Sequence, residues 1–395
     1  MTTPPDFVHL HVHSQYSILD GQASIQKLVD KAMRDGQPGI ALTDHGNMFG
    51  IKEFYNYVKK VKGKYKAQAA EAEARLAALV DGSQAPADPA EIARCRAELA
   101  DLKRKAAFKP IIGSEVYVAR RRMQDKEGKP DQSGYHLILL AKNLKGYHNL
   151  IKIVSKAWTE GFYMRPRTDR VELEKYHEGL ICSSACIGSE ISQYYLQGDE
   201  KRAEQALHEY LDIFGPDNFF IELMDHYMDE ERRCNRFLID LARRNNLRMI
   251  ATNDVHYMRK EDAEAHEIML CIQTGARLAE KHFKFSGPDY YFKTEQEMKE
   301  LFREVPEAVT NTRLVAERCS MKFHYVPEVN HYPKFYMPDG RLADRNDLRE
   351  VCFDNMEYRY GFDPRKLDKL TDEQQQIIDR MDYELGVIEK TGFIS

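Results

Sequence analysis

The chain has 395 residues, of which 43% are hydrophobic and 31% charged, so it can bury a large core and is expected to form two or three domains. No stretch approaches the roughly 18 uncharged apolar residues that a spanning helix needs, and the first residues lack the pattern of a signal peptide, which predicts a soluble cytoplasmic protein without membrane contact. The formal net charge of -5 argues against a protein wrapped in nucleic acid on all sides but allows a local basic face.

Seven short apolar runs rich in β-branched residues predict β-strands. They are Phe7–Leu10, Gly39–Thr43, Pro110–Val118, Leu137–Ala141, Leu180–Ser183, Phe219–Leu223 and Met249–Thr252. Between most of them, apolar residues repeat at the three- and four-residue spacing of helices. This alternation implies a parallel sheet of an α/β fold, and seven units suit a closed barrel better than a small open sheet.

The segment from Lys64 to Ala107 interrupts this alternation. It is rich in Ala, Glu, Arg and Leu and carries two heptad-like apolar stripes. Glycine and proline between Asp81 and Pro89 end one helix and begin the next, which predicts an antiparallel helical hairpin. We expect a solvent-facing insertion, with a partner-docking arm as the alternative.

After His256 the alternation fades, and the chain becomes helix-rich. A second domain is predicted to start near residue 285. The last predicted helix spans about Asp372 to Lys390.

Histidine and acidic residues gather at the ends of the predicted strands. His9, His11 and His13 alternate along the first run, His45 follows the second, and Asp254-Val255-His256 follows the seventh. The carboxyl ends of parallel strands meet at one edge, where a barrel places its functional loops. Imidazole and carboxylate together suit zinc, manganese or iron, and more ligands than one ion can use imply a polynuclear site.

Other residues leave two interpretations open. His9 either supports the ligands or lies on the strand surface. Cys186 on its own has the spacing of a core cysteine, and the seven cysteines of the chain are expected to be reduced thiols. Glu222, Asp225 and His226, at the end of the sixth predicted strand, either line the pocket or serve the fold.

Three motifs resemble the polymerase and histidinol phosphatase (PHP) superfamily. They are His9 to Ser14 with Tyr16-Ser17 and Asp20-Gly21, then Thr43 to Gly46, then Asn253 to His256. The resemblance implies a distorted seven-stranded (β/α)7 TIM-like barrel over residues 1–284, with 64–107 as its helical-hairpin insertion.

Further segments resemble, more narrowly, the alpha subunits of bacterial DNA polymerase III. These segments are Gly113 to Tyr117, Gly161 to Tyr163, Ser184 to Gly188 and Gly287 to Tyr291. This resemblance implies that residues 285–395 are the first, truncated part of an α+β polymerase palm. The polymerase aspartates of that family follow a glycine-rich segment for which Gly392 to Ser395 looks like the lead-in, so we expect no nucleotide addition by this chain.

The resemblance implies nine ligands for three divalent metal ions, which are zinc, manganese or iron. The ligands are His11, His13, Asp20, His45, Glu115, His136, Cys186, Asp254 and His256. The implied grouping is His11, His13, Glu115 and Asp254 on one ion, Glu115, His136 and Cys186 on a second, and Asp20, His45 and His256 on a third. Asp254, Glu115 and His13 are expected to carry the catalysis.

The implied activity is 3′–5′ exonuclease cleavage at the 3′ end of a DNA primer, which corresponds to proofreading. Expected partners are this primer end, the remainder of the polymerase and other replisome subunits. One alternative is a metal-stabilised structural or docking module without catalysis, and another is a small-molecule phosphatase. The polymerase-like continuation beyond residue 260 speaks against the phosphatase.

Overall fold

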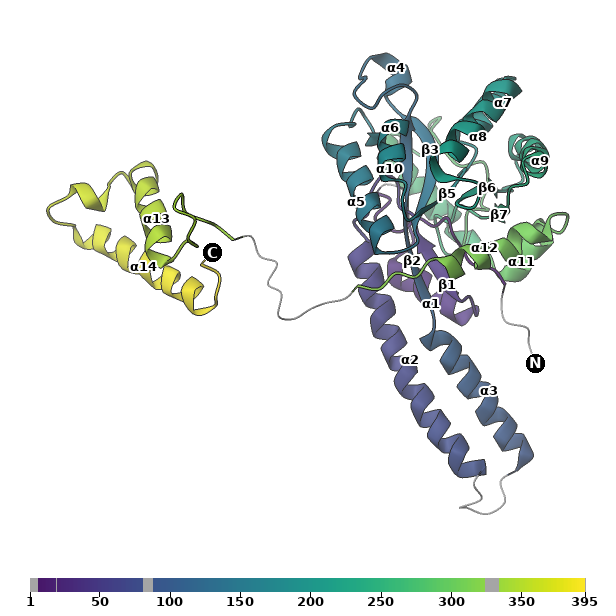
Figure 1. The fold of residues 1–395 in the computed structure, drawn as a ribbon, viewed down its shortest axis with the longest axis horizontal. Coiled ribbons are helices and arrows are strands. Elements are labelled where there is room, and N and C mark those ends of the chain that lie inside the picture. The colour runs from purple at the N-terminus through teal and green to yellow at the C-terminus, as the bar shows by residue number, and fades with distance from the viewer. Residues whose placement is uncertain (1–5, 19, 81–87, 324–333, 395) are drawn as a thin grey trace. The chain divides into compact units, whose positions relative to one another are not determined.

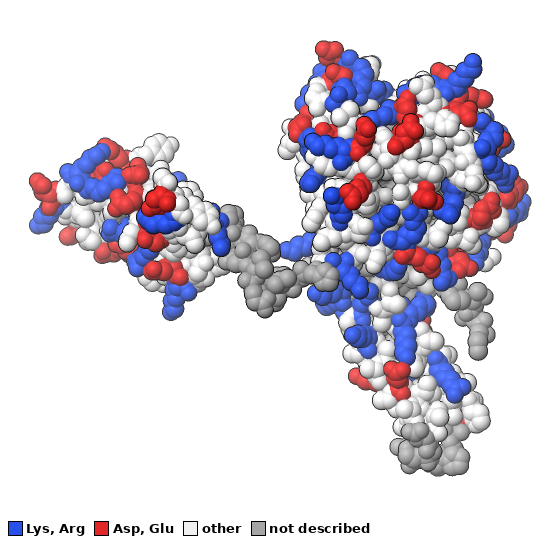
Figure 2. All heavy atoms as spheres, viewed as in Figure 1, with Lys and Arg blue, Asp and Glu red and all other residues white. Residues whose placement is uncertain are grey.

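The computed structural model describes residues 6–18, 20–80, 88–323 and 334–394 of the chain. Its residues form two compact units, Met1–Phe323 and His324–Ser395, of which the first contains an α/β barrel (Figure 1). Among the described residues, none of the helices combines the length and the apolar character that crossing a bilayer requires. Figure 2 shows Lys and Arg interspersed with Asp and Glu over the visible face of the first unit.

One seven-stranded sheet forms the barrel wall, in the order β1-β2-β3-β5-β6-β7 with β4 paired to β2. The strands are β1 Gly39–Leu42, β2 Lys109–Ala119, β3 Gly134–Ala141, β4 Arg167–Thr168, β5 Leu180–Ser183, β6 Phe219–Leu223 and β7 Met249–Ala251. Six of the predicted strands are therefore confirmed. The two-residue strand β4 was not predicted, because it is too short to show an alternating pattern.

The segment containing the first predicted strand closes the barrel between β1 and β7. The carbonyl of His9 accepts from Ala41 N, and that of Val12 accepts from Thr43 N, both at 2.9 Å. On the other side, His13 N donates to Val255 O at 2.8 Å. Between these two hydrogen bonds the segment advances by three residues, from His9 to Val12, while its partner advances by two, from Ala41 to Thr43. The pairing therefore contains a bulge. The structure thus has one isolated bridge here, Val12 to Val255, instead of the predicted strand Phe7–Leu10.

The prediction of a parallel sheet was wrong for β3. This strand runs antiparallel to both β2 and β5, whereas the other pairs are parallel. A parallel return needs a crossover connection, usually a helix. The segment between β2 and β3 contains only the four-residue helix α4 Gly128–Asp131, so the chain turns back beside β2.

Helices pack around this wall, and most of them carry apolar faces into one large core. They are α1 Ile25–Arg34, α5 Leu144–Thr159, α6 Arg170–Tyr176, α7 Glu190–Leu196, α8 Glu200–Phe214, α9 Asp229–Arg244, α10 Ala263–Thr274, α11 Glu295–Leu301 and α12 Pro306–Arg318, with the 3-10 helix η1 Lys260–Asp262. In α8 the buried residues include Ala203, Leu207 and Tyr210, which recur at helical spacing. Ser24 begins α1 by accepting from Lys27 N.

The domain boundary predicted near residue 285 falls inside the first unit. Helix α12 packs against β7, where Asn311 Nδ2 donates to Met249 O at 2.9 Å. Near the N-terminus, Val8 N donates to Oγ1 of Thr312, which also lies in α12, at 3.0 Å. These contacts hold the chain to the barrel as far as Phe323.

The second unit is a small helical assembly. It contains α13 Arg345–Tyr360, η2 Pro364–Lys366 and α14 Asp372–Lys390. Its helices enclose a core of Phe353, Met356, Phe362 and Ile378, and Arg349 pairs with Asp382 at 2.6 Å. The last helix matches the predicted range, while the assignment of residues 285–395 to a polymerase palm stays a prediction.

The predicted hairpin is present as α2 Ile51–Val80 and α3 Pro89–Ala106, which lie side by side (Figure 1). Helix α2 begins earlier than Lys64, because Ile51, Phe54 and Val58 pack into the barrel core. Farther out, Ala69, Ala72 and Leu99 form a separate small core with Leu76 and Leu102. Most of the predicted turn Asp81–Pro89 lies outside the described residues.

Replacing residues 67–103 by a short Gly/Ser link should leave the barrel intact, because the small core of the hairpin is separate from the main core. We expect the thermal midpoint to move by no more than about 3 °C, which calorimetry measures. Phe54→Ala, in the main core, should cost about 3–5 kcal/mol and shows that the assay responds. A large loss of stability in the deletion variant would show that the outer hairpin braces the barrel.

Candidate metal centre

The nine predicted ligands lie together at one end of the barrel. His11 and His13 come from the segment that closes it, His45 follows β1, and Asp254 follows β7. The antiparallel direction of β3 is what brings His136 to this end, because the start of β3 lies beside the end of β2, with His136 opposite Tyr117. Cys186 follows β5.

Glu115 lies at the middle of the cluster, with 1% of its side chain exposed. Its Oε1 lies 2.8 Å from His136 Nδ1 and 3.5 Å from His11 Nε2. Its Oε2 pairs with His45 Nδ1 and lies 3.9 Å from His13 Nε2. One carboxylate thus faces four imidazoles, which is the position of a ligand shared between ions.

Asp254 approaches the same histidines from the other side. Its Oδ1 lies 3.2 Å from His11 Nε2 and 3.1 Å from His13 Nε2. The backbone at Asp254 has φ of 44°, a left-handed conformation that non-glycine residues adopt at a cost. Ala185, directly before Cys186, has φ of 60°. Two of the loops that deliver ligands therefore hold unfavourable backbone conformations.

A third group of ligands contains His13, His45 and His256. The ring of His13 lies between the other two, with centroid distances of 3.9 Å to His45 and 4.4 Å to His256. Asp20 Oδ2 lies 3.3 Å from His45 Nε2. On the far side of Glu115, Cys186 Sγ lies 3.4 Å from His136 Nδ1.

The donor atoms form three sets, and within each set all the atoms lie within 4.8 Å of one another. They are His11 with His13 and Glu115, then Glu115 with His136 and Cys186, then His13 with His45 and His256. The second set equals one predicted grouping and the first is part of another. In the third, His13 stands where the prediction had Asp20.

The donors fit divalent metal ions. Within the described part of the chain, two buried atoms of the predicted ligands, Asp20 Oδ1 and His256 Nε2, lack any hydrogen-bond partner. Buried polar atoms are normally paired, so convergent unpaired donors are typical of a coordination site. Nitrogen and oxygen ligands with one sulfur suit zinc, manganese or iron.

The electrostatics keep the carboxylates ionised. Burial alone would raise the pKa of Glu115, but His136, His45 and His11 outweigh it and hold that pKa well below its usual range. The pKa of Asp254 is likewise lowered, since His11 and His256 outweigh burial. Burial lowers the pKa of His13 to about 3, so its ring is neutral and offers a lone pair. Anionic oxygens and a neutral imidazole are forms that bind a cation, whereas nearby carboxylates outweigh burial and raise the pKa of His11 and of His45, so these two rings would release a proton when a metal ion binds.

Glu222 orients the ligand His11 from behind. Its Oε1 lies 2.8 Å from His11 Nδ1 and accepts from Thr252 Oγ1 at 2.6 Å, while Oε2 accepts from Ser183 Oγ. This contact directs His11 Nε2 toward the cluster. The sequence had left Glu222 open, although a charged residue inside the apolar run Phe219–Leu223 already indicates a partner.

Ser17 orients the imidazole of His13 in the same way. Its hydroxyl lies 2.9 Å from His13 Nδ1 and donates to Asp44 Oδ1 at 2.8 Å. Asp44 also accepts from Ser14 N at 2.7 Å, so it braces the loop instead of joining the cluster. No sequence signal separated Ser17 from the other serines.

The other residues left open lie outside the cluster. His9 is buried, with Nε2 2.8 Å from Lys293 O and its ring against Phe292. His226 pairs with Glu231 at 2.8 Å. Neither residue contributes an atom to the three donor sets.

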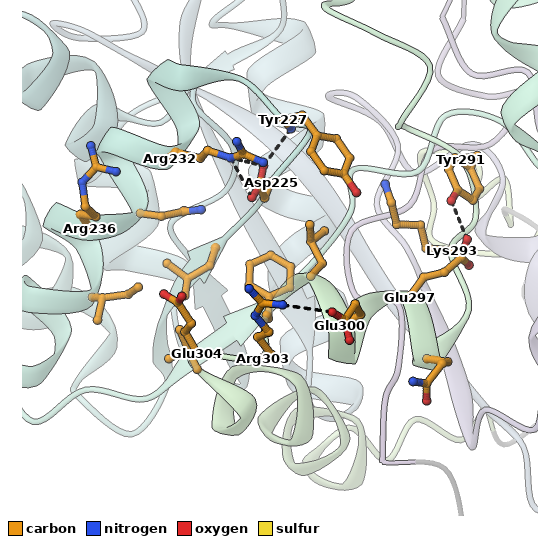
Figure 3. A pocket seen from close by; sticks show the side chains of 17 residues that line it. Asp225, Tyr227, Arg232, Arg236, Tyr291, Lys293, Glu297, Glu300, Arg303 and Glu304 are labelled. Atoms are coloured by element: carbon orange, nitrogen blue, oxygen red, sulfur yellow. Dashed lines mark hydrogen bonds and ion pairs between the residues drawn. The ribbon is translucent and has the colours of Figure 1, made fainter.

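Asp225 lines a separate surface cavity of about 870 Å³ (Figure 3). Its carboxylate pairs with Arg232 at 3.2 Å, Glu300 pairs with Arg303 at 3.3 Å, and Tyr291 donates to Glu297 at 2.6 Å. These charged groups satisfy one another, and none of them belongs to the three donor sets.

Comparison with known families agrees with this fold. The family model of the PHP domain matches residues 9–226, which contain seven of the nine predicted ligands and more than half of the chain. The chain belongs to the PHP domain family. Asp254 and His256 lie beyond the matched range.

The chain is also similar along nearly its whole length to DNA polymerase III subunit alpha. The Treponema pallidum protein is 36% identical over 98% of this chain, and the Thermus aquaticus protein is 38% identical over 90%. This chain spans 28% and 26% of those two proteins, respectively. A solved structure from Bifidobacterium adolescentis, described as a candidate metal-dependent phosphoesterase, aligns with 75% of this chain and 97% of its own, with 11% identity and a TM-score of 0.34, a likeness too weak to carry an argument.

Glu222→Gln should weaken metal binding by about 10- to 100-fold, because it removes the carboxylate that orients His11. Titration with zinc or manganese followed by calorimetry measures the change. Glu231→Gln is the matched control, since it breaks an equally buried carboxylate–imidazole pair, with His226, outside the cluster. Equal affinity in both variants would contradict the orienting role of Glu222.

Proposed function

We propose that this chain is a metal-dependent phosphodiesterase that removes nucleotides from the 3′ end of DNA, as a proofreading exonuclease does. The observation that carries the proposal is the convergence of nitrogen, oxygen and sulfur donors at one end of the barrel, seven of them in three close groups and the carboxylates of Asp20 and Asp254 beside these groups. We further propose that they bind three divalent ions, which are zinc, manganese or iron.

The chain's own residues would hold the ions and position the phosphate. Glu115 lies between the donor sets and would be shared by two ions, while Asp254 would contribute negative charge beside His11 and His13. Divalent ions bound together generate hydroxide near neutral pH and stabilise charge on a phosphate. No serine or cysteine nucleophile is needed for this hydrolysis.

Similarity to a polymerase subunit supports a DNA end as the substrate. The relatives are named as DNA polymerase III subunit alpha, and a primer 3′ end is the DNA end on which a polymerase works. We therefore propose the primer end, the remainder of a polymerase and other replisome subunits as partners.

Protein purified without added metal should contain about three ions per chain, because a single ion of this type uses no more than about six ligands. Elemental analysis combined with native mass spectrometry counts and identifies them. Asp254→Asn and His136→Ala, which remove ligands from different proposed ions, should each reduce the count. A saturated site with a single ion would contradict the trinuclear centre.

Asp254→Asn should lower exonuclease activity by about 100-fold or more, since a ligand carboxylate contributes charge that the phosphate transition state needs. Asparagine tolerates the left-handed backbone at this position, so the fold should persist. The assay follows a 5′-labelled primer–template with manganese or zinc. Asp225→Asn, in the separate cavity, should keep wild-type activity.

The same reaction separates the alternatives. A ladder of shortened primers supports the exonuclease, whereas a primer lengthened on addition of deoxynucleotides would contradict the expectation that this chain adds no nucleotides. Rapid phosphate release from histidinol phosphate without DNA cleavage would favour a small-molecule phosphatase. A filled metal site with no reaction on either substrate would favour a structural module.

A further inference from the structure

Three aromatic side chains lie exposed beside the loop that carries His45. Phe49, Trp158 and Phe162 have 57%, 41% and 44% of their surfaces exposed. Trp158 stacks on Phe162 with a centroid distance of 5.5 Å and lies 6.1 Å from Phe49. Because such large rings are usually buried, a contiguous exposed group of them indicates a binding surface. We refer to these three residues as the aromatic platform.

Trp158 of the platform is tied by a direct hydrogen bond to the loop beside the predicted ligand His45. Trp158, at the end of α5, donates from Nε1 to the carbonyl of Gly46 at 2.8 Å. Gly46 follows the predicted ligand His45, and its own N–H donates to Glu115 O at 2.7 Å. The position of the rings is thus set by the loop and strand that deliver two ligands.

Arg165, a cation without a carboxylate partner among the described residues, lies three residues after Phe162. The guanidinium of Arg165 lies 5.9 Å from the ring of Tyr117, which in turn stacks 6.4 Å from His45. Within the described ranges, the Arg165 side chain takes part in no ion pair and no hydrogen bond. Met164 before it has φ of 62°, and Tyr163 bridges to Arg165, so a tight turn separates Phe162 from Arg165 in the chain.

Flat apolar rings and a cation without a carboxylate partner match the chemistry of single-stranded nucleic acid. Unpaired bases stack on aromatic faces, while arginine contacts the phosphates between them. Bases within a duplex cannot reach such a surface, because they are already stacked on their neighbours. An end that has frayed from its template offers both free base faces and a phosphate.

We propose that the aromatic platform and Arg165 hold the last unpaired bases of a single-stranded DNA end, so that its phosphodiester lies at the metal centre. This inference rests on the proposed exonuclease function and adds its specificity, a preference for unpaired over paired ends. The platform would hold bases of any sequence, because every base has a face that stacks.

The platform contains the only tryptophan of the chain, so binding is read directly from intrinsic fluorescence. We expect a single-stranded oligothymidylate of about eight nucleotides to quench Trp158, and a blunt duplex of the same length to quench it much less. Phe162→Ala should weaken binding of the oligonucleotide by about ten-fold, measured by anisotropy of a labelled strand. Arg165→Gln should weaken it and reduce its dependence on salt.

Matched variants separate stacking from general apolar contact. Phe162→Tyr keeps the aromatic face and should bind like the wild type, whereas Phe162→Leu keeps apolar surface and should behave like Phe162→Ala. Phe335→Ala, which removes an exposed ring from the other unit, should have no effect. Circular dichroism and metal content are compared across all variants, so that a misfolded protein is recognised.

The outcomes distinguish this inference from the proposed function. If the oligonucleotide quenches Trp158 but is never shortened, the exonuclease proposal fails and the platform stands. If DNA is shortened while Trp158 does not respond and Phe162→Ala binds like the wild type, the platform proposal is wrong. Absence of any oligonucleotide binding also overturns the platform proposal. The aromatic platform would then fit an apolar segment of a partner protein.

Discussion

The buried carboxylate of Glu115, surrounded by imidazoles, is the constraint on which this end of the barrel depends. An unpaired charge in a protein interior costs several kcal/mol, so its position requires partners with positive or coordinating groups. Those partners come from segments far apart in the sequence, including His11, His45 and His136. The requirement to satisfy one carboxylate therefore links three segments of the barrel and accounts for the convergence of their donor atoms.

Much of the fold followed from local patterns. Six strands were predicted because apolar β-branched runs bounded by turns are a local signal, and the hairpin because its apolar stripes and prolines are local too. The direction of β3 depends on the connection that precedes it, which contains only the short helix α4. The alternation of predicted strands and helices does not take this connection into account. The sequence predicted a domain boundary near residue 285, but the first unit extends to Phe323. The packing of α12 on β7, which extends the unit, depends on contacts between distant residues that local patterns do not show.

The ligand set shows the same division. His11, His13 and Asp254 were recognisable because residues at strand ends meet in a barrel, whatever the details of the loops. His9 has the same alternating spacing as His11, but it faces Phe292 and the carbonyl of Lys293. Periodicity gives the face of a strand and not the depth along it, so only the structure separates these two histidines. The role of Glu222 likewise depends on which imidazole lies opposite its carboxylate.

Closure of the barrel by the segment around Val12, bridged to Val255, has a consequence for biosynthesis. During synthesis the first ligands leave the ribosome long before the last, and a chain grows by only about 5–20 residues per second. His11 and His13 thus spend many seconds without Asp254 and His256, and no partial chain can present the complete set of donors. Ions that bind early would meet an incomplete cluster, so the final geometry is selected only when the two distant segments pair.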